Sequence, residues 1–594
     1  MMFGPQIRRD AVLFRLWAPR QQLVLIEVDA APALRMNRTE DGWHELSVKH
    51  AGAGSRYMFQ LENGIKIPDP ASRYQPEDVH GPSEVVDLAP SLSKSDWNGR
   101  PWETAIIYEM HVGTFTPQGT FLAAIERLPW LVELGVTAIE LMPVGDFPGQ
   151  RGWGYDGVLW FAPDASYGRP EHLQQLIQAA HDHGIMVFLD VIYNHFGPDG
   201  NYLPLYAPIF NEQHHTPWGA AVNFDADGSD VVRQFVIANA LYWLQEFRFD
   251  GLRFDAVHAM RDDSGRHLLD ELGHLIRAAT PGRTVHLILE NEENQAERLQ
   301  RDDQFRPVTF TAQWNDDCHH VLHTAATGEH SGYYGEYAGD TEKLGRALAE
   351  GFAFQGDLMQ YRGRPRGEPS AHLPPTAFIS FIQNHDQVGN RARGDRIHHL
   401  ASKQAMRAIA CVYLLCPQVP MIFMGEEFCA SSPFPFFCDF SGDLAQSVRD
   451  GRRAEFSKFP EFQDPANLAE IPDATALETF ESAKLNWDEV DDPEHRDCVD
   501  LYRRLIATRR REIVPRLSGL SGHHGRYEVL DDLAVKVQWE LNGATLTLLA
   551  NLKDRPAPSP RMPPGRTIWS VNDEGASYLS AWAVLWSVKD QDIK

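Results

Sequence analysis

Three acidic residues stand at the ends of apolar runs in widely separated parts of the chain: Asp255 in GLRFDAVH, Glu290 in VHLILE and Asp386 in FIQNHD. Arg253 lies two positions before Asp255, so both side chains would project from the same face of a strand. A neighbouring arginine favours the charged form of a carboxylate, which a nucleophile requires. Glu290 ends its apolar run, where partial burial would keep a general acid protonated. Such a set of carboxylates suits the cleavage of a glycosidic bond.

Imidazole and further acidic side chains accompany these carboxylates. His385 directly precedes the third of them, and His195 ends the segment DVIYNH. Both are candidates to bind sugar hydroxyls, whose hydrogen bonds tighten in the transition state of glycoside cleavage. Glu292 and Glu293 follow the candidate acid in a polar loop, where we expect them to be solvated. An isolated arginine–carboxylate pair or a lone histidine is more often structural, so the assignment depends on the whole set.

The elements that would position these residues form a repeating pattern over residues 104–485. Eight apolar, strand-like runs alternate there with amphipathic helical segments, which predicts a catalytic (β/α)8 barrel with loop insertions. The runs are AIIYEMHV, VTAIELMPV, IMVFLDVIYNH, GLRFDAVH, VHLILEN, PVTFTAQW, TAFISFIQNHD and VPMIFMGEE. Several end in charged, amide or imidazole residues, as expected where a barrel builds its active site at the C-terminal ends of its strands. An open doubly wound sheet is the alternative, but the Gly-rich turn that usually follows its first strand is absent.

Both flanks of this region predict β-structure. Residues 1–95 contain short strand-like runs separated by Gly, Pro and Asp, which predicts an N-terminal, immunoglobulin-like β-sandwich. A linker is expected around SLSKSDWNGRPWE. After the barrel a helical segment, DPEHRDCVDLYRRLIATRRREI, leads to short strands that predict a C-terminal β-domain over residues 520–594. The predicted fold class is therefore multidomain α/β, with a central TIM barrel between two β-domains.

Composition disfavours several classes of function. The net charge of −27 argues against nucleic acid or an anionic membrane surface as a partner, since both need concentrated Lys and Arg. No apolar run reaches the roughly 18 residues of a membrane-spanning helix. The six cysteines form no CxxC pair and no cluster with zinc spacing, which predicts free thiols in a reducing, cytoplasmic compartment. Carboxylates can supply the acid, the base and the nucleophile, so we expect no metal and no other cofactor.

Four segments resemble, in order along the chain, the signature segments of the α-amylase family of glycoside hydrolases: DVIYNH, GLRFDAVH, LILE and QNHD. The resemblance implies that Asp255 is the nucleophile, Glu290 the general acid/base and Asp386 the stabiliser of the transition state. It also implies retention of the anomeric configuration. The substrate-binding residues expected from these segments and from WGYD are Tyr155, His195, Arg253, His258, His385 and Arg391.

The predicted front β-sandwich narrows the resemblance to branching enzymes, debranching enzymes and the members that hydrolyse the α-1,4 bond next to a terminal trehalose. The segments YEMHVGTFTPQGT, NHFGPDGNY, QWNDDCHH and QNHDQVGNR look most like the last group. The implied substrate is an α-glucan oligosaccharide with a trehalose end, supplied by a maltooligosyltrehalose-forming enzyme. Trp314, Asn315 and Asp316 are the candidates for trehalose recognition, because buried polar groups reject ligands that lack their partners. A packing role at the strand end is the alternative for each of them.

Three functions stay open at this point. The first is the trehalose-releasing hydrolase, and the second is a glycogen branching enzyme, which transfers glucan chains and does not release them to water. The third is a catalytically inactive glucan-binding protein on the same barrel, since a fold does not fix a function. The intact set of Asp255, Glu290 and Asp386 favours an enzyme.

Overall fold

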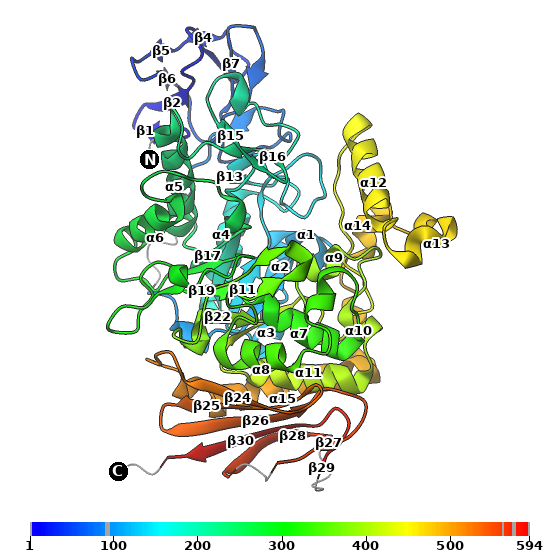
Figure 1. Cartoon of the computed structure of the whole chain (residues 1–594). Coiled ribbons are helices and arrows are strands. Elements are labelled where there is room, and N and C mark those ends of the chain that lie inside the picture. Colours follow the sequence, from blue (N-terminus) through cyan, green and yellow to red (C-terminus); the bar gives the residue numbers. More distant parts are fainter. Residues whose placement is uncertain (1–2, 89–95, 561–563, 573–577, 592–594) are drawn as a thin grey trace.

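The computed structural model describes residues 3–88, 96–560, 564–572 and 578–591, so residues 91–95 of the expected linker lie outside the described part. Three parts follow one another along the chain: two small sheets, a barrel with its helices, and an antiparallel sheet near the C-terminus. The two β-rich parts lie on opposite sides of the barrel (Figure 1).

A closed barrel of eight parallel strands forms the centre of the molecule, which confirms the predicted (β/α)8 architecture. The strands pair in chain order, and the last one closes the ring on the first. They are β10 (Ile107–Met110), β11 (Ala138–Leu141), β14 (Met186–Val191), β17 (Gly251–Phe254), β18 (His286–Leu289), β19 (Ala312–Trp314), β22 (Phe378–Ser380) and β23 (Val419–Phe423). Each lies within one of the eight apolar runs of the sequence.

Helices cover the outside of the barrel between successive strands. The main ones are α3 (Leu128–Leu134), α4 (Pro170–Asp182), α5 (Ser229–Glu246), α6 (Leu268–Ala279), α7 (Asp316–Thr327), α8 (Thr341–Glu350), α11 (Lys403–Leu415) and, after the last strand, α15 (Pro493–Glu512). In α6 the apolar residues Leu268, Leu272 and Ile276 recur every four positions and are all buried, as in an amphipathic helix against a core. The connection from β18 to β19 departs from the repeat, because its described residues form only the 3-10 helix η5 (Ala296–Leu299).

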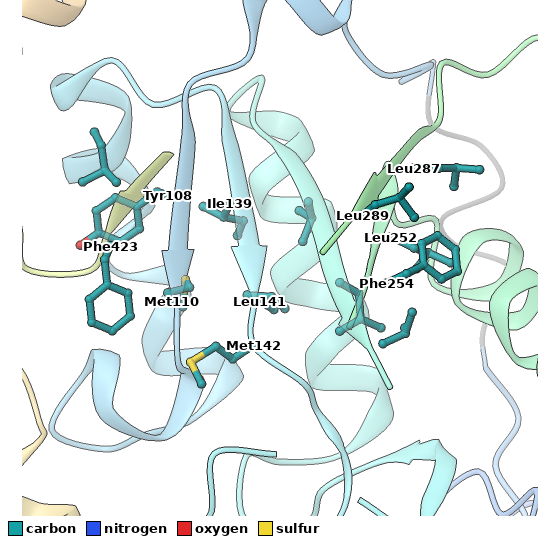
Figure 2. Close-up of a cluster of buried hydrophobic side chains, with 14 of the residues drawn as sticks. Tyr108, Met110, Ile139, Leu141, Met142, Leu252, Phe254, Leu287, Leu289 and Phe423 are labelled. Carbon is teal, nitrogen blue, oxygen red and sulfur yellow. The ribbon is translucent and has the colours of Figure 1, made fainter. Parts of the chain in front are cut away.

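Alternation along the barrel strands separates two apolar layers. Side chains such as Tyr108, Ile139 and Leu252 join the large core that includes the surrounding helices (Figure 2). The alternate positions, among them Ile107 and Ala138, form a separate cluster with residues of the other barrel strands. Because residues two apart in a strand share a face, the side chains two positions further along must also enter the barrel.

The N-terminal part consists of two antiparallel sheets. One contains β1 (Gln6–Arg8), β2 (Ala11–Trp17), β6 (Trp43–Lys49) and β5 (Asn37–Arg38). The other contains β4 (Leu34–Arg35), β3 (Leu25–Val28), β7 (Arg56–Gln60) and β8 (Lys66–Ile67), with β9 (Ser83–Glu84) paired to β7. The rings of Phe14 in β2 and Tyr57 in β7 lie 4.6 Å apart and are both buried, so the sheets pack against each other as the layers of a sandwich.

The C-terminal part is a five-stranded antiparallel sheet that packs on the barrel. Its strands, in spatial order, are β24 (Gly525–Asp531), β25 (Ala534–Leu541), β26 (Ala544–Asn551), β30 (Val584–Asp590) and β28 (Arg566–Val571). The indole N–H of Trp586 donates to the carbonyl oxygen of Cys411 at 3.0 Å, which fixes this sheet to α11. Among the described helices, none is both long and apolar enough to cross a membrane.

Candidate active site

Four side chains of ionisable residues form a layer, here named the charged layer, inside the barrel and above the apolar cluster. Glu109 and Glu140 are partners across β10 and β11, and Asp190 and Arg253 are partners across β14 and β17. All four are almost completely buried. Strand alternation puts them at the interior, and their position near the C-terminal ends of the strands puts them directly below Asp255.

Arg253 joins the carboxylates of this layer to those of the rim. Its Nη1 donates to Asp255 Oδ1 at 2.9 Å and to Asp190 Oδ2 at 2.6 Å. Its Nη2 donates to Glu290 Oε2 at 2.8 Å. The guanidinium carbon lies 4.0 Å from the ring centre of Trp314, a cation–π contact. One buried cation therefore holds the candidate nucleophile and the candidate acid next to each other.

Asp255 is held in one orientation through both of its oxygens. Besides the contact with Arg253, its Oδ2 accepts a hydrogen bond from Asn194 Nδ2 at 2.8 Å. The next residue, Ala256, has a positive φ of 40°, a strained conformation for a residue with a Cβ atom. Its N–H donates to Glu290 Oε2 at 2.9 Å. The turn after the nucleophile thus also positions the acid.

Glu290 has the asymmetry expected of a proton donor. Its Oε2 accepts from both Arg253 and Ala256, whereas Oε1 has no hydrogen-bond partner among the described residues. Burial raises the pKa of Glu290 above its ordinary value and Asp255 raises it further, although Arg253 opposes the shift. The proton of the neutral acid would then lie on Oε1, the oxygen that is free to meet a substrate.

Asp386 and His385 lie at the start of the short helix α9 (His385–Gly389), across the barrel mouth from Asp255. The carboxylate of Asp386 is 40% exposed, and its Oδ1 lies 3.6 Å from Nε2 of His385. The imidazole stacks on the ring of Tyr155, with 4.9 Å between ring centres. The hydroxyl of Tyr155 donates to Asp190 at 2.6 Å, so the ring is tied to the charged layer.

His195 contacts the backbone of Tyr155 and stacks on an exposed tryptophan. Its Nε2 is 3.1 Å from the carbonyl oxygen of Tyr155. Its ring stacks on Trp218 at 4.6 Å with nearly parallel planes. Trp218 is 51% exposed and belongs to the turn between β15 (Phe210–Thr216) and β16 (Gly219–Val222). Such an open ring face is suited to contact with a sugar ring.

The remaining predicted binding residues, His258 and Arg391, form ion pairs with carboxylates other than Asp255, Glu290 and Asp386. His258 is partly exposed, and its Nε2 is 4.0 Å from Glu292. Glu292 and Glu293 are paired with Arg362, so the expectation that they are simply solvated misses this ion pair. Arg391 forms a bidentate pair with a different carboxylate, Glu329, at 2.7 and 3.0 Å.

The segment after β19 divides into surface and core residues. Trp314 and Asn315 are buried, whereas Asp316 is partly exposed. Asp316 follows β19, which pairs with β18, the strand that ends just before Glu290. Burial raises the pKa of Asp316 well above its ordinary value, and Glu290 raises it further.

Asn315 needs a correction, because its side chain does not reach the open site. Its Oδ1 caps α7 by accepting from the N–H of Cys318, and its Nδ2 donates to Gly351 O at 2.7 Å and Gln418 Oε1 at 2.9 Å. The side chain of Asn315 has no exposed surface, and both its amide oxygen and its amide nitrogen are hydrogen-bonded within the protein. Asn315 therefore has the packing role that the sequence left open as the alternative.

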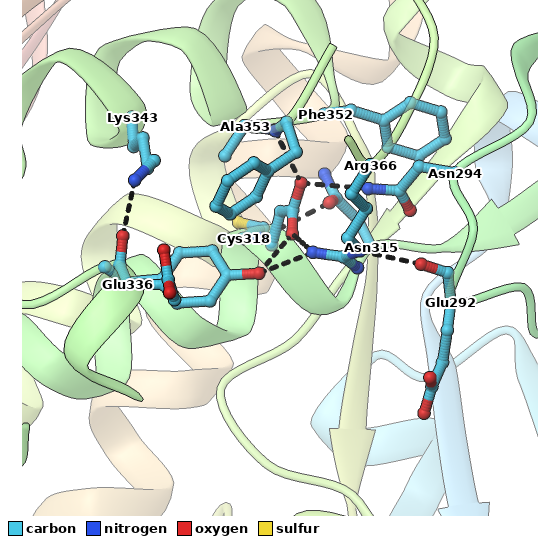
Figure 3. Close-up of polar contacts among 12 residues, drawn as sticks. Glu292, Asn294, Asn315, Cys318, Glu336, Lys343, Phe352, Ala353 and Arg366 are labelled. Carbon is cyan, nitrogen blue, oxygen red and sulfur yellow. Dashed lines mark hydrogen bonds and ion pairs between the residues drawn. The ribbon is translucent and has the colours of Figure 1, made fainter. Parts of the chain in front are cut away.

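Asp317 ties the same segment to Arg366 and Ala353, which are among the residues labelled in Figure 3. Its carboxylate accepts from Arg366 at 2.6 Å, from the hydroxyl of Tyr337 at 2.7 Å and from the N–H of Ala353 at 2.7 Å. Burial alone would raise the pKa of Asp317, but Arg366 and these donors outweigh it and lower the pKa. Asn315 and Asp317 therefore hold this segment in place through buried hydrogen bonds.

One group of side chains in the described part of the chain has the spacing of metal ligands: His214, Asp225 and Asp263. Asp225 already accepts from His214, from Asn211 and from the N–H of Asp263. The group lies on the β15–β16 hairpin side and contributes nothing to the carboxylate cluster.

Sequence reasoning missed three residues that hold the site together. Asn194 orients Asp255, Trp218 covers His195, and Glu109 contacts His385. A signal existed for Glu109, because it is a charged residue inside the otherwise apolar run AIIYEMHV. No comparable signal marks Trp218, whose role depends on how the β15–β16 hairpin in the connection from β14 to β17 folds over His195.

Comparison with known proteins agrees with this geometry. The family model "Alpha amylase, catalytic domain" matches residues 90–204, and a domain of unknown function matches residues 522–586. The malto-oligosyltrehalose trehalohydrolase of Saccharolobus solfataricus is 38% identical over 89% of this chain and 90% of its own length. The protein of the same name from Deinococcus radiodurans is 41% identical over 86% of this chain and 84% of its own. The chain belongs to the malto-oligosyltrehalose trehalohydrolase family.

Solved structures extend the likeness to the whole chain. A crystal structure of a Salmonella typhimurium protein described as an alpha amylase has a TM-score of 0.95 and 44% identity, and the match covers 99% of both chains. A pullulanase from Paenibacillus barengoltzii in complex with maltotetraose has a TM-score of 0.72 at 18% identity, which shows a shared fold. A branching enzyme from Corynebacterium jeikeium is 32% identical but matches only 46% of this chain.

Proposed function

We propose that this chain is a retaining glycosidase that hydrolyses the α-1,4-glucosidic bond next to the terminal trehalose of maltooligosyl trehalose. The products are trehalose and a maltooligosaccharide. The observation that carries the chemistry is the single guanidinium of Arg253, which contacts both Asp255 and Glu290. Two carboxylates on one cation favour the short separation, about 5–5.5 Å, of retaining enzymes. The names of the full-length relatives support the trehalose-ended substrate.

The reaction proceeds in two displacements at one anomeric carbon. In the first, Asp255 forms a bond to that carbon, the bond to the trehalose oxygen breaks, and Glu290 gives its proton to this oxygen. In the second, Glu290 takes a proton from water, the water oxygen bonds to the carbon, and the bond to Asp255 breaks. Two inversions retain the α configuration. Asp386 is proposed to bind sugar hydroxyls most strongly in the transition state.

The residues proposed to contact the substrate lie around the carboxylates at the mouth of the barrel. Tyr155, His195 and His385 are proposed to bind the sugar whose bond is cleaved, because their rings gather beside Asp255 and Asp386. Asp316 is proposed to bind the trehalose unit, since it is partly exposed and follows the strand that pairs with the one preceding Glu290.

Less direct roles are proposed for the other predicted residues. Trp314 supports Arg253 from the barrel interior, and Arg253 itself acts through the two carboxylates that it holds. His258 and Arg391 are proposed to contact parts of the substrate other than the sugar whose bond is cleaved.

A glycogen branching or debranching enzyme is the runner-up, and an inactive glucan-binding protein is the third candidate. The matched branching enzyme covers under half of this chain, whereas the trehalohydrolases cover most of it, which favours the hydrolase. We also propose that a maltooligosyltrehalose-forming enzyme supplies the substrate. A cytoplasmic location is proposed because all six cysteines are free thiols.

The test compares two substrates by chromatography of their products. Maltotriosyl trehalose should yield free trehalose and maltotriose, and maltopentaose, which has the same number of glucose units, should be cleaved far more slowly. New branch points from either substrate would favour the branching enzyme. Absence of any product would favour the inactive protein.

A further inference from the structure

Glu109 and His385 form a buried pair at the back of the site. Nδ1–H of the imidazole donates to Glu109 Oε1 at 2.5 Å, and the backbone N–H of the same histidine donates to Glu109 Oε2 at 3.1 Å. Both side chains are at most 2% exposed. The Glu109 carboxylate therefore accepts two hydrogen bonds from His385, which fix both the orientation of the imidazole ring and its distance from the carboxylate.

The other ring nitrogen faces the open site. Nε2 of His385 lies 3.6 Å from Oδ1 of Asp386, whose carboxylate is 40% exposed. Tyr155 stacks on one face of the imidazole, and Trp153 meets it edge-on with 5.5 Å between ring centres. With Nδ1 committed to Glu109, a proton on Nε2 can only be offered toward Asp386 and a bound sugar.

The charges around the pair favour a doubly protonated imidazole. Burial alone would lower the pKa of His385, but Glu109 and Asp386 outweigh it, against a smaller effect of Arg253, and raise the pKa to about 9. Burial lowers the pKa of His111, the other imidazole nearby, to about 4.

Burial opposes ionisation of the other acidic groups around the pair. Burial raises the pKa of Glu140 well above its ordinary value, and Glu109 adds to the shift. Burial likewise raises the pKa of Tyr155 well above its ordinary value. Burial also raises the pKa of Asp386, although His385 opposes that shift. The ionisable groups whose charges act on His385 are Glu109, Asp386 and Arg253.

We propose that Glu109 is a positioning residue that keeps His385 doubly protonated, so that Nε2–H acts as a cationic donor to Asp386 and to a hydroxyl of the cleaved sugar. The inference rests on the proposed glycosidase function. Charge-assisted hydrogen bonds are about twice as strong as neutral ones, so the donor gains strength at the point where the substrate is held. The negative charge of Glu109 directly behind the ring compensates its positive charge.

Glu109→Gln removes the charge and can keep the geometry. The amide oxygen can accept from the backbone N–H of His385 while the amide N–H donates to Nδ1, which leaves a neutral ring with its proton on Nε2. We expect kcat to fall about tenfold at neutral pH, the difference between a charged and a neutral donor. Glu426→Gln is the control, because Glu426 is likewise a buried carboxyl group and, among the described residues, bonds to Tyr413 and Tyr502 and not to His385. It should stay within about twofold of the wild type.

The pH dependence separates a charge effect from a structural one. The ratio of wild-type to Glu109→Gln kcat should be constant up to about pH 8 and should shrink as the pH rises through about 9, where the wild-type ring loses its second proton. The titration of Glu290 affects both enzymes and cancels in the ratio. A ratio that stays constant across this range would mean that Glu109 only shapes the site, and the proposal would be wrong.

Two further measurements keep the proposal testable if Glu109→Gln does not fold. Glu109→Asp keeps the negative charge, so the ratio of wild-type kcat to Glu109→Asp kcat should not shrink above pH 9. Ring 15N chemical shifts of His385, assigned by the signal lost in His385→Gln, should show both nitrogens protonated at pH 7.5. A neutral ring would overturn the proposal even if trehalose is released. Failure to release trehalose would instead refute the proposed function, and the protonation state of His385 measured from the 15N chemical shifts would not be affected.

Discussion

Replacing Glu290 by glutamine removes the acidic proton with little change of shape. The amide oxygen can still accept from Arg253 and from the N–H of Ala256, the two donors now bound to Oε2. The amide group would replace Oε1, which has no hydrogen-bond partner among the described residues and so carries the proton in the proposed mechanism. Because the folded protein keeps these hydrogen bonds, the substitution should lower the rate of glycosidic bond cleavage without lowering the stability. Loss of a positioned acid costs about 10²–10⁴ in rate, and we expect at least several hundredfold.

The assay is the initial rate of trehalose release from maltotriosyl trehalose between pH 4 and 9. The wild-type rate should fall as the pH rises through the raised pKa of Glu290, because only the protonated acid can donate. The variant should lose this alkaline limb together with its rate. Glu292→Gln, two residues away and 47% exposed at its side chain, is the control and should stay within about twofold. Near wild-type activity of Glu290→Gln, or an equal loss in the control, would refute the assignment.

Three further changes test other parts of the structure. Asp255→Asn should slow trehalose release by at least about 10³ in the same assay, and a smaller loss would exclude Asp255 as the nucleophile. Arg366→Met should destabilise the protein by about 3–5 kcal/mol in urea unfolding, because it leaves the buried carboxylate of Asp317 unpaired; a cost below about 1 kcal/mol would contradict this account. Glu426 is buried, and burial raises its pKa from 4.5 to about 7, so the stability it contributes is complete below pH 4.5 and is lost as the pH rises through about 7. Glu426→Gln should therefore reduce the drop in melting temperature between pH 5 and pH 8, and an unchanged drop would contradict the shifted titration.

The barrel could be predicted from the sequence because its signal is local. Each strand is an apolar run, and polar residues mark where the run meets the barrel mouth, as in GLRFDAVH and FIQNHD. Period and order along the chain were sufficient to give eight strands. The prediction of eight β–α units did not separate out the connection between β18 and β19, although η5 lies in a polar segment without helical periodicity, which favours a loop.

The residues that support the site were harder to predict than the residues that would react. Asp255 and Glu290 have chemistry that marks them by type and position. Glu109 acts through a contact with His385, which is 276 residues away, and only the closed barrel brings the two together. Asn315 shows the opposite error, because a polar residue at a strand end resembled a ligand contact and proved to be a helix cap.

The measurement that tests the central claim most directly is a proton NMR time course of maltotriosyl trehalose with the wild-type enzyme, begun within the first seconds of reaction. Asp255 and Glu290 acting as a retaining pair predict free trehalose together with maltotriose whose new reducing end is first the α anomer, before mutarotation. A new reducing end that is first the β anomer, or the absence of free trehalose, would contradict the account.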